Sequence, residues 1–237
     1  MDKVYEFYTG KPYINRDTLS THMRDRTPPL EKELKYFLTK RDYDKLLRAS
    51  RKEVLTTLKQ LNVYFDDNAL RLRKKRIGLR VRIENQDKCT LTLKEPSKIR
   101  SKKVPKLKVR HEWESALPLS LAKQVIKGRA PIGSLKKKPI LVLKHHFSDS
   151  QIKKIMPLGS LKTVRTLVPA DHGILLEIDK FKMFGRKFYE LEVETHDPVL
   201  ADQTVRSLLR KLKISCRPIT KSKLGRFLDI WKKERRR

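Results

Sequence analysis

A period-two alternation of apolar and charged residues recurs along most of this chain and limits what it can fold into. Successive side chains of a β-strand point to opposite faces. The segment from Glu31 onward therefore places Glu31, Glu33 and Lys35 on one face, with Leu34 and Tyr36 on the other. The same alternation predicts strands near residues 30–38, 62–66, 69–75, 78–84, 89–95, 107–114, 161–168, 173–181 and 186–195.

The polar faces of these strands are sorted rather than mixed. Charged side chains gather on one face of each segment, as in Arg80, Arg82 and Glu84, in Arg110, Glu112 and Glu114, and in Glu190, Glu192 and Glu194. Like charges two residues apart on one strand face repel, so each run of acids needs cations beside it. If the sheet closes into a barrel, these faces can all point inward and line a lumen with acids and bases together.

Three helices and several connections complete the predicted pattern. Helices are expected at 40–58, 118–127 and 198–212, the last opened by Asp197 and Pro198 as N-cap and first-turn proline. The residues 85–88 and Gly185 fit hairpin turns, so neighbouring strands should be antiparallel. Phe227 and Trp231 fit the core stripe of a final helix, and no structure is predicted for 96–108 or 134–138. We expect an arm at 1–29, one domain at 30–230 and a basic tail at 231–237.

The charge balance points toward polyanionic ligands. The 237 residues include 58 Lys and Arg against 27 Asp and Glu, a formal net charge of +31. The longest apolar run, residues 140–143, is far shorter than the roughly 20 residues of a membrane-spanning helix. Cys89 and Cys216 are far apart in sequence, which argues against a disulfide framework or a zinc knuckle. The sequence thus predicts a cytoplasmic protein that handles a polyanion, with no membrane partner.

A lumen that carries both signs of charge suits a metal-bound polyphosphate. Mg²⁺ and Mn²⁺ prefer carboxylate oxygens, while Lys and Arg neutralise phosphate oxygens. The metal can polarise a phosphoryl group, and the cations can stabilise charge on the leaving phosphate. The chain contains no P-loop, no Rossmann glycine pattern and no His-x-x-x-His zinc signature that would suggest another chemistry.

Several short motifs, in their order along the chain, resemble those of the CYTH domain family, also called the triphosphate tunnel metalloenzymes. The first strand fits the family's E-x-E-x-K signature, and the later motifs follow between about residues 30 and 230. The resemblance is strongest to the single-domain bacterial branch. These motifs are residues 31–35, 64–66, 79–82, 91–96, 112–114, Asp179, 189–194 and 221–226.

The resemblance implies an α+β fold, an eight-stranded antiparallel β-barrel or tunnel with flanking helices. It also implies roles for individual residues. The expected ligands of Mg²⁺ or Mn²⁺ are Glu31, Glu33, Glu190 and Glu192. The expected catalytic residues are Lys35, Glu112, Glu114 and Asp179, of which the three acids would hold a second metal or orient the water. The expected substrate-binding residues are Lys35, Arg80, Arg82, Lys94, Arg165, Lys221, Lys223 and Arg226.

The expected activity is metal-dependent hydrolysis of a triphosphate, with inorganic tripolyphosphate as the first candidate substrate. Nucleoside triphosphates, thiamine triphosphate and the 5′-triphosphate of RNA remain open, as does a module that binds polyphosphate or RNA without turnover. Adenylate cyclase activity ranks lower because no adenine-reading pocket is evident. Retention of many carboxylates favours catalysis, since pure polyanion binding would improve without them.

A second basic feature lies outside the predicted strands. Lysines and arginines in the predicted loops could form an external patch for RNA or polyphosphate, or they could be ordinary solvated charges. These residues are Lys98, Arg100, Lys102, Lys103, Lys106, Lys108 and Lys136 to Lys138.

Overall fold

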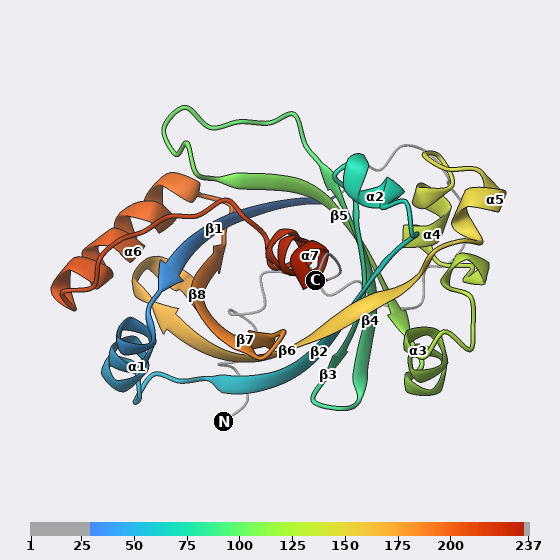
Figure 1. The fold of residues 1–237 in the computed structure, drawn as a ribbon. Helices are drawn as coiled ribbons and strands as arrows, with labels where there is room; N and C mark the ends of the chain where they lie inside the picture. The colour runs from blue at the N-terminus through green and yellow to red at the C-terminus, as the bar shows by residue number, and fades with distance from the viewer. Residues whose placement is uncertain (1–28, 235–237) are drawn as a thin grey trace, which may run out of the picture.

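The computed structural model describes residues 29–234 (Figure 1). The predicted N-terminal arm lies outside the described residues except for its last position, and so do the last three residues of the predicted tail. No helix within the described part is long and apolar enough to cross a membrane.

Eight strands form a closed barrel, in which each strand is antiparallel to both of its neighbours (Figure 1). Around the barrel the order is β1-β5-β4-β3-β2-β6-β7-β8. The predicted α+β class with an eight-stranded antiparallel β-barrel is therefore confirmed. The strands are β1 (Leu30–Leu38), β2 (Thr56–Asp66), β3 (Gly78–Glu84), β4 (Lys88–Pro96), β5 (Lys108–Leu117), β6 (Met156–Ala170), β7 (Ile174–Met183) and β8 (Arg186–Glu194).

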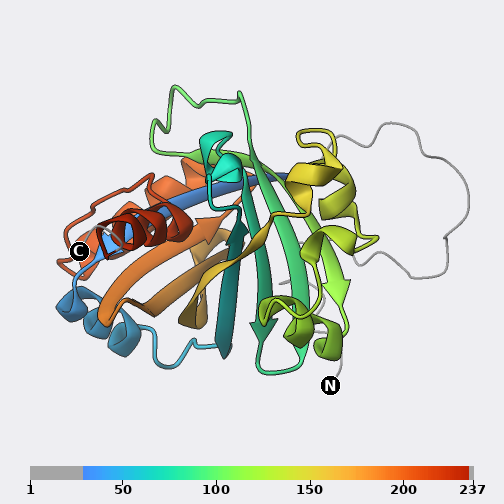
Figure 2. The ribbon, with the colours of Figure 1, turned by 45° about the vertical axis from the view of Figure 1, so that its right-hand side comes forward.

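Helices pack on two sides of the barrel wall, as the turned view also shows (Figure 2). Helices α1 and α6 lie on one side, and α2 to α5 lie on the other. The α-helices are α1 (Lys40–Ala49), α2 (Arg71–Lys74), α3 (Leu119–Ile126), α4 (Lys138–Leu143), α5 (Asp149–Ile152), α6 (Pro198–Lys211) and α7 (Lys223–Glu234). Two short 3₁₀ turns, Ile132–Ser134 and Asp171–Gly173, complete the described elements.

Two large hydrophobic clusters lie outside the barrel, between its wall and these helices. On β1 and β8, the outward Tyr36 and Leu191 pack with Leu46 of α1 and Val205 of α6. A second cluster joins the outward faces of β3 and β4 to α3 and α4. Where a helix covers the apolar outer face of a strand, the charged face is left for the lumen, because alternate side chains point to opposite sides.

The predicted helix 40–58 is too long, because the chain changes to strand geometry near its end. Helix α1 ends at Ala49, and β2 begins at Thr56. Two adjacent threonines, Thr56 and Thr57, favour an extended backbone. Val54, which the helical pattern placed on the core side, is 37% exposed, and Leu58 instead lines the lumen.

The strand predicted at 69–75 is also wrong, because this segment forms α2. The buried carboxylate of Asp66 accepts hydrogen bonds from the backbone N–H groups of Leu72 (3.0 Å) and Arg73 (2.9 Å), which holds the turn. Leu70 and Leu72 alternate with basic residues over too short a span to distinguish a strand from one helical turn. The predicted helices at 118–127 and 198–212 correspond to α3 and α6 within one residue at each end.

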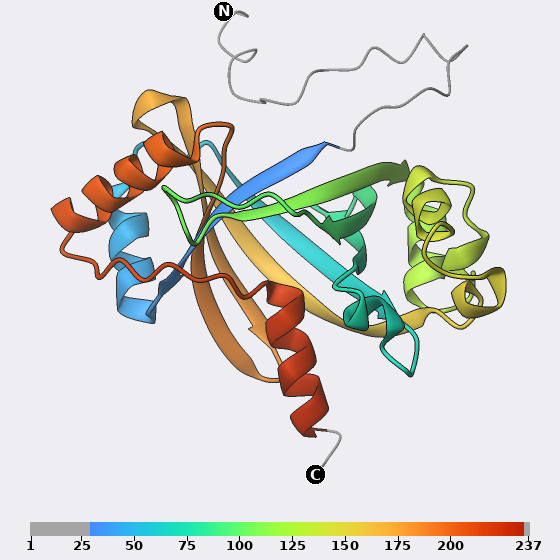
Figure 3. The same cartoon turned by 90° about the horizontal axis from the view of Figure 1, so that it is seen from above.

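The C-terminal segment fills a gap between β1 and β5. The pairing of β1 with β5 stops at Glu33. Beyond Glu33, the segment that precedes α7 forms backbone hydrogen bonds with β1 instead. The N–H of Phe37 donates to the carbonyl of Arg217 (2.9 Å), and the N–H of Ile219 donates to that of Lys35 (2.8 Å). This segment leads into α7, which lies across the opening of the barrel in the view along its axis (Figure 1) and beside the strands from above (Figure 3).

We expect Thr39→Ala to lower the free energy of unfolding by about 1 kcal/mol. The Thr39 hydroxyl accepts from the N–H of Asp42, and the Asp42 carboxylate accepts from the N–H of Thr39, so the two residues cap α1 reciprocally. Urea denaturation of Thr39→Ala, with Thr39→Ser as the matched control, measures this loss. Equal stability of the alanine and wild-type proteins would show that the cap contributes nothing.

Candidate active site in the barrel lumen

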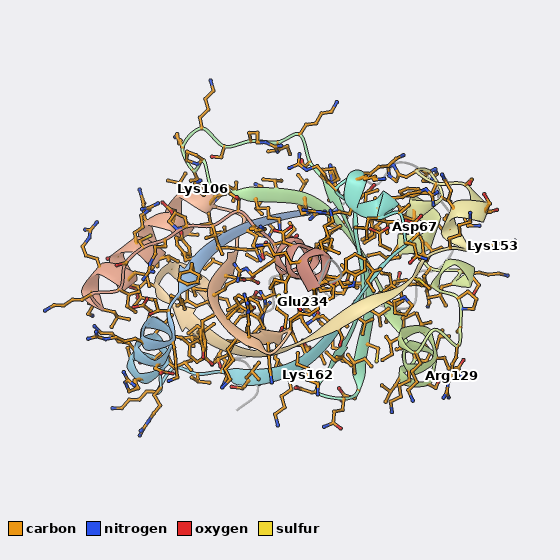
Figure 4. All side chains as sticks on the ribbon, viewed as in Figure 1. Asp67, Lys106, Arg129, Lys153, Lys162 and Glu234 are labelled. Carbon is orange, nitrogen blue, oxygen red and sulfur yellow. The ribbon has the colours of Figure 1, made fainter. Side chains whose placement is uncertain are left out.

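The inward faces of all eight strands, together with α7, line a cavity of about 1000 Å³. Side chains from the strands fill the interior of the ring in the axial view (Figure 4). The charged residues that line the cavity are Glu31, Lys32, Glu33, Lys35, Arg80, Arg82, Glu84, Lys88, Lys94, Lys108, Arg110, Glu112, Glu114, Arg165, Glu177, Glu192, Glu194, Asp197 and Lys223. The alternation in the sequence therefore correctly predicts that acidic and basic side chains line this lumen together.

Strand register gathers the acids on one wall, formed by β1, β8 and β7. Three carboxylate pairs are direct cross-strand partners there, namely Glu33 with Glu194, Glu177 with Glu192 and Asp179 with Glu190. Like charges placed directly opposite each other destabilise a sheet. This acid wall can fold only because several cations lie among its carboxylates.

Arg165 of β6 is the main cation of the acid wall. Its guanidinium donates two hydrogen bonds to Asp179 (2.8 and 2.7 Å) and one to Glu192 (2.7 Å), and it forms an ion pair with Glu177. Burial alone would lower the pKa of Arg165, but the three carboxylates raise it well above its usual value. Burial opposes ionisation of Asp179, yet Arg165 and Lys223 hold the pKa of that carboxyl below its usual value.

Two lysines complete the neutralisation of Glu192. The Nζ atom of Lys35 pairs with Glu192 and lies 2.8 Å from Glu33. The Nζ atom of Lys223, from α7, lies 2.5 Å from Glu192 and 2.7 Å from Asp179. Burial raises the pKa of Glu192, but the surrounding cations outweigh it and hold that pKa well below its usual range.

Glu190 lies deeper than the other predicted ligands. Its side chain is fully buried, and it is not among the residues that line the cavity. Arg226 (2.8 Å) and Lys223 (3.3 Å) pair with its oxygens. Within residues 29–234, neither oxygen accepts a hydrogen bond of good geometry. Burial raises the pKa of Glu190 despite these cations.

Glu31 and Glu112 share a lysine on the other side of β1. Lys94 lies 2.5 Å from Glu31 and 3.3 Å from Glu112. Burial opposes ionisation of Glu31, but the charge and hydrogen bond of Lys94 lower its pKa to about 2. Burial instead dominates at Glu112 and raises the pKa of that carboxyl.

Unlike the cations of the acid wall, Arg80 and Arg82 on β3 contact neutral side chains. Arg82 donates to the amide oxygen of Asn62 (2.9 Å), and Arg80 is 3.4 Å from the hydroxyl of Thr92. Among the described residues, neither arginine has a carboxylate within ion-pair distance, and Nε of Arg80 is buried without a hydrogen-bond partner. Burial, together with Arg80 and Arg165, lowers the pKa of Arg82 to about 10.

Eleven of the residues predicted from sequence meet at the cavity, and four do not line it. Lys35, Glu112, Glu114, Arg80, Arg82, Lys94, Arg165, Lys223 and two of the predicted metal ligands, Glu31 and Glu33, line the cavity together with Glu192. Asp179 and Glu190 lie behind it and contact residues that line it, and Arg226 pairs with Glu190. Lys221 is exposed and pairs with Asp229 of α7.

Several charged residues of the lumen were not among the predicted site residues. Lys108 was expected in an external loop, but it begins β5 and lies 3.9 Å from Glu33, so that assignment is wrong. Arg110, Glu177 and Glu194 also line the cavity. Arg110, Glu177 and Glu194 are each two positions from a predicted site residue, so the period-two alternation contained the signal that would have found these three.

The carboxylates are separated by cations in this arrangement. Among the described residues, no three His, Cys, Asp or Glu side chains converge in a geometry that would hold a metal ion. Each predicted metal ligand instead pairs with a lysine or arginine, as Glu31 does with Lys94 and Glu33 with Lys35.

We expect Arg165→Met to lower the free energy of unfolding by about 3–5 kcal/mol, because it leaves buried carboxylates without their cation. Arg165→Lys keeps the charge but loses the two parallel hydrogen bonds to Asp179, so its stability should be intermediate. Guanidinium denaturation of the three proteins provides the measurement. Stability unchanged in the methionine variant would contradict the central role given to Arg165.

Comparison with known proteins agrees with this arrangement. Residues 29–228 match the sequence model of the CYTH domain. YjbK of Bacillus subtilis (strain 168), described as a candidate triphosphatase, is 28% identical over 200 residues, which are 84% of this chain and 95% of YjbK.

Solved structures show the same barrel. HpAC1 from Hippeastrum, described as a candidate adenylyl cyclase with a dominant triphosphatase activity, is 25% identical with a TM-score of 0.74, over 84% of this chain and 95% of that one. A candidate adenylate cyclase from Bacillus halodurans has the same fold, with a TM-score of 0.64 and 22% identity over 82% of this chain and 95% of that one. The chain described here, with its charged eight-stranded lumen, belongs to the CYTH domain family.

Proposed function

We propose that this chain hydrolyses a triphosphate in the barrel lumen with the help of a divalent cation. The observation that carries the proposal is the pair Arg80 and Arg82, two half-buried cations that face the cavity and have no carboxylate within ion-pair distance among the described residues. A buried charge is costly unless it is compensated. A phosphate chain in the cavity would supply the missing anionic oxygens.

The arginines suit this role by geometry as well as by charge. A guanidinium presents parallel donors that match two oxygens of a phosphate. Lys108 adds a third cation whose pKa responds to its surroundings, since burial lowers that pKa to about 8 and an anion beside it would raise the pKa again. Together with Lys94, these side chains form the cationic part of the lumen, on β3, β4 and β5.

The donor chemistry of the acid wall fits a hard divalent cation. Glu31, Glu33 and Glu192 offer carboxylate oxygens at the cavity, and Glu190 lies behind them with oxygens that accept no hydrogen bond within residues 29–234. Binding of Mg²⁺ or Mn²⁺ by these four residues requires Lys35 and Lys94 to release their carboxylates. When bound, the cation would polarise the terminal phosphoryl group and lower the pKa of a water.

Other lumenal residues would handle protons and orientation. Glu112 lines the cavity, and burial raises its pKa, so its carboxylate is suited to accept a proton from water. Glu114, held by the hydroxyl of Thr92 (3.0 Å), would orient that water. Asp179 acts as a positioning residue, since it holds Arg165 and Lys223 from behind the cavity. Lys35 and Arg165 would then stabilise charge on the leaving phosphate.

The relatives support the reaction class but leave the substrate open. YjbK and HpAC1 are both described in terms of triphosphatase activity. We propose inorganic tripolyphosphate as the simplest substrate that the charges would hold. An organic triphosphate is a second candidate, because three leucines, Leu58, Leu167 and Leu175, also line the cavity and offer an apolar surface to a substituent.

One assay separates these candidates. Phosphate release should be measured with tripolyphosphate, ATP, thiamine triphosphate and triphosphate-ended RNA, each with Mg²⁺ or Mn²⁺. Leu175→Asn should leave tripolyphosphate turnover unchanged and raise KM for a preferred organic triphosphate. Binding of all four compounds without turnover of any would identify a non-catalytic module instead.

Hydrolysis should require added Mg²⁺ or Mn²⁺ and should stop in EDTA. Replacing Glu31, Glu33, Glu190 or Glu192 with Gln should lower kcat by about 100-fold or more, because each substitution removes a charged oxygen ligand. Thermal melts should show that the variants stay folded. Activity that survives EDTA would falsify the metal requirement.

Arg80→Ala and Arg82→Ala should each lower kcat/KM by about 10- to 100-fold, since each removes a charge-assisted contact to phosphate. Arg80→Lys and Arg82→Lys should recover only part of the loss, because an ammonium lacks the parallel donors. Steady-state kinetics on the preferred triphosphate make the comparison. Wild-type kinetics in both alanine variants would exclude these arginines from the phosphate site.

A further inference from the structure

A row of three lysines crosses the outer surface of the barrel. Lys162 of β6 is the direct cross-strand partner of Lys182 of β7, which in turn is the direct partner of Lys187 of β8. All three are exposed. Adjacent strands lie about 4.8 Å apart, so the three side chains leave the sheet within about 10 Å of one another. We call these three residues the lysine row.

Two further cations flank the lysine row on the same outer face. Val164, two residues after Lys162, pairs with Lys59 of β2 on one side and with Lys180 of β7 on the other. Both lysines are exposed, and Val164 itself is 36% exposed. Five lysines therefore surround one small apolar side chain on four adjacent strands.

This part of the wall is not covered by the described helices. Helices α1 and α6 lie at one side of the barrel and α2 to α5 at the other, while β2 and β6 form its bare lower edge in Figure 1. Lys162 lies at that edge in Figure 4, far from Lys153 and Arg129.

The lysine row has no compensating acids nearby in the described chain. Within residues 29–234, none of its three ammonium groups is paired with a carboxylate. Like charges directly opposite each other weaken a sheet. The arrangement therefore costs stability by itself and gains free energy only when an anion with several closely spaced charges covers it.

We propose that this face docks the phosphate backbone of a nucleic acid. A nucleic-acid strand supplies regularly spaced phosphates, and lysines contact them without reading sequence. A lipid surface fits less well. Interfacial binding needs large apolar side chains that insert beside the cations, but Val164 at the centre of this face is small. Phe184 in the β7–β8 turn is 39% exposed, but its ring packs against Phe227 of α7.

The lysine row is separate from the lumen. Lys162, Lys182 and Lys187 do not line the cavity, whereas Arg165 and Glu177 on the same strands do. Alternate residues of β6 and β7 therefore point to opposite sides of the barrel wall, into the lumen or toward the outer surface. Nucleic-acid docking and triphosphate handling can be tested by different substitutions.

The test uses the full chain and a fluorescently labelled 20-nucleotide oligouridylate with a 5′-hydroxyl end. The variant Lys162→Gln, Lys182→Gln, Lys187→Gln removes the lysine row. The control Lys123→Gln, Lys153→Gln, Lys154→Gln removes the same charge from exposed lysines of α3 and the end of α5. Fluorescence anisotropy between 50 and 200 mM salt gives Kd and its salt dependence for each protein.

We expect the lysine-row variant to bind at least about 10-fold more weakly at 50 mM salt. Its salt slope should fall by about 2, since each phosphate contact with a single strand contributes about 0.7. The control should change Kd less than 3-fold. The lysine-row variant should also melt at the same or a higher temperature in low salt, because the repulsion is relieved, so weaker binding cannot come from unfolding.

Three results would overturn the proposal. Equal losses in the lysine-row variant and the control would mean that only net charge matters. Loss of oligouridylate binding in the double variant Arg80→Ala, Arg82→Ala would place the oligonucleotide in the lumen. Binding to phosphatidylserine vesicles that depends on the lysine row, without binding to oligouridylate, would assign the face to a membrane surface.

Discussion

The need to neutralise charge inside a closed barrel governs this structure. Three pairs of acids face each other across β1, β8 and β7, and they can coexist only because Arg165, Lys35 and Lys223 lie among them. These cations come from three different elements, β6, β1 and α7. Closure of the sheet and docking of the last helix are thus required by the same set of charges.

The sequence predicts the barrel well because its main signal is local. Alternation within a single strand is enough to assign Glu31, Glu33 and Lys35 to one face, and the resemblance of the motifs to one family extends the assignment across the chain. Local alternation fails where a segment is short. Residues 69–75 alternate like a strand, but the capping of α2 by Asp66 depends on a buried carboxylate that the pattern does not reveal.

The pairing and register of the strands could not be predicted from the sequence alone. Within residues 29–234, the lack of a carboxylate at ion-pair distance from Arg80 and Arg82 depends on which strands flank β3. The alignment of Lys162, Lys182 and Lys187 depends on the register across β6, β7 and β8. A further difficulty is the boundary between loop and strand. Lys108 falls in the overlap between the loop expected at 96–108 and the strand predicted at 107–114, and it was assigned to the external patch with the loop.

The inner charges also explain why the outer lysines remain aligned. Arg165 and Asp179 are cross-strand partners, and in the same register Lys162 faces Lys182. A shift of one residue would turn every side chain of β7 to the other face, and a shift of two would move Asp179 away from Arg165. Breaking a buried ion pair costs about 3–5 kcal/mol, whereas opposed surface charges cost about 0.2–1 kcal/mol. The lumen therefore sets the register, and the repulsion on the outside is too weak to change it.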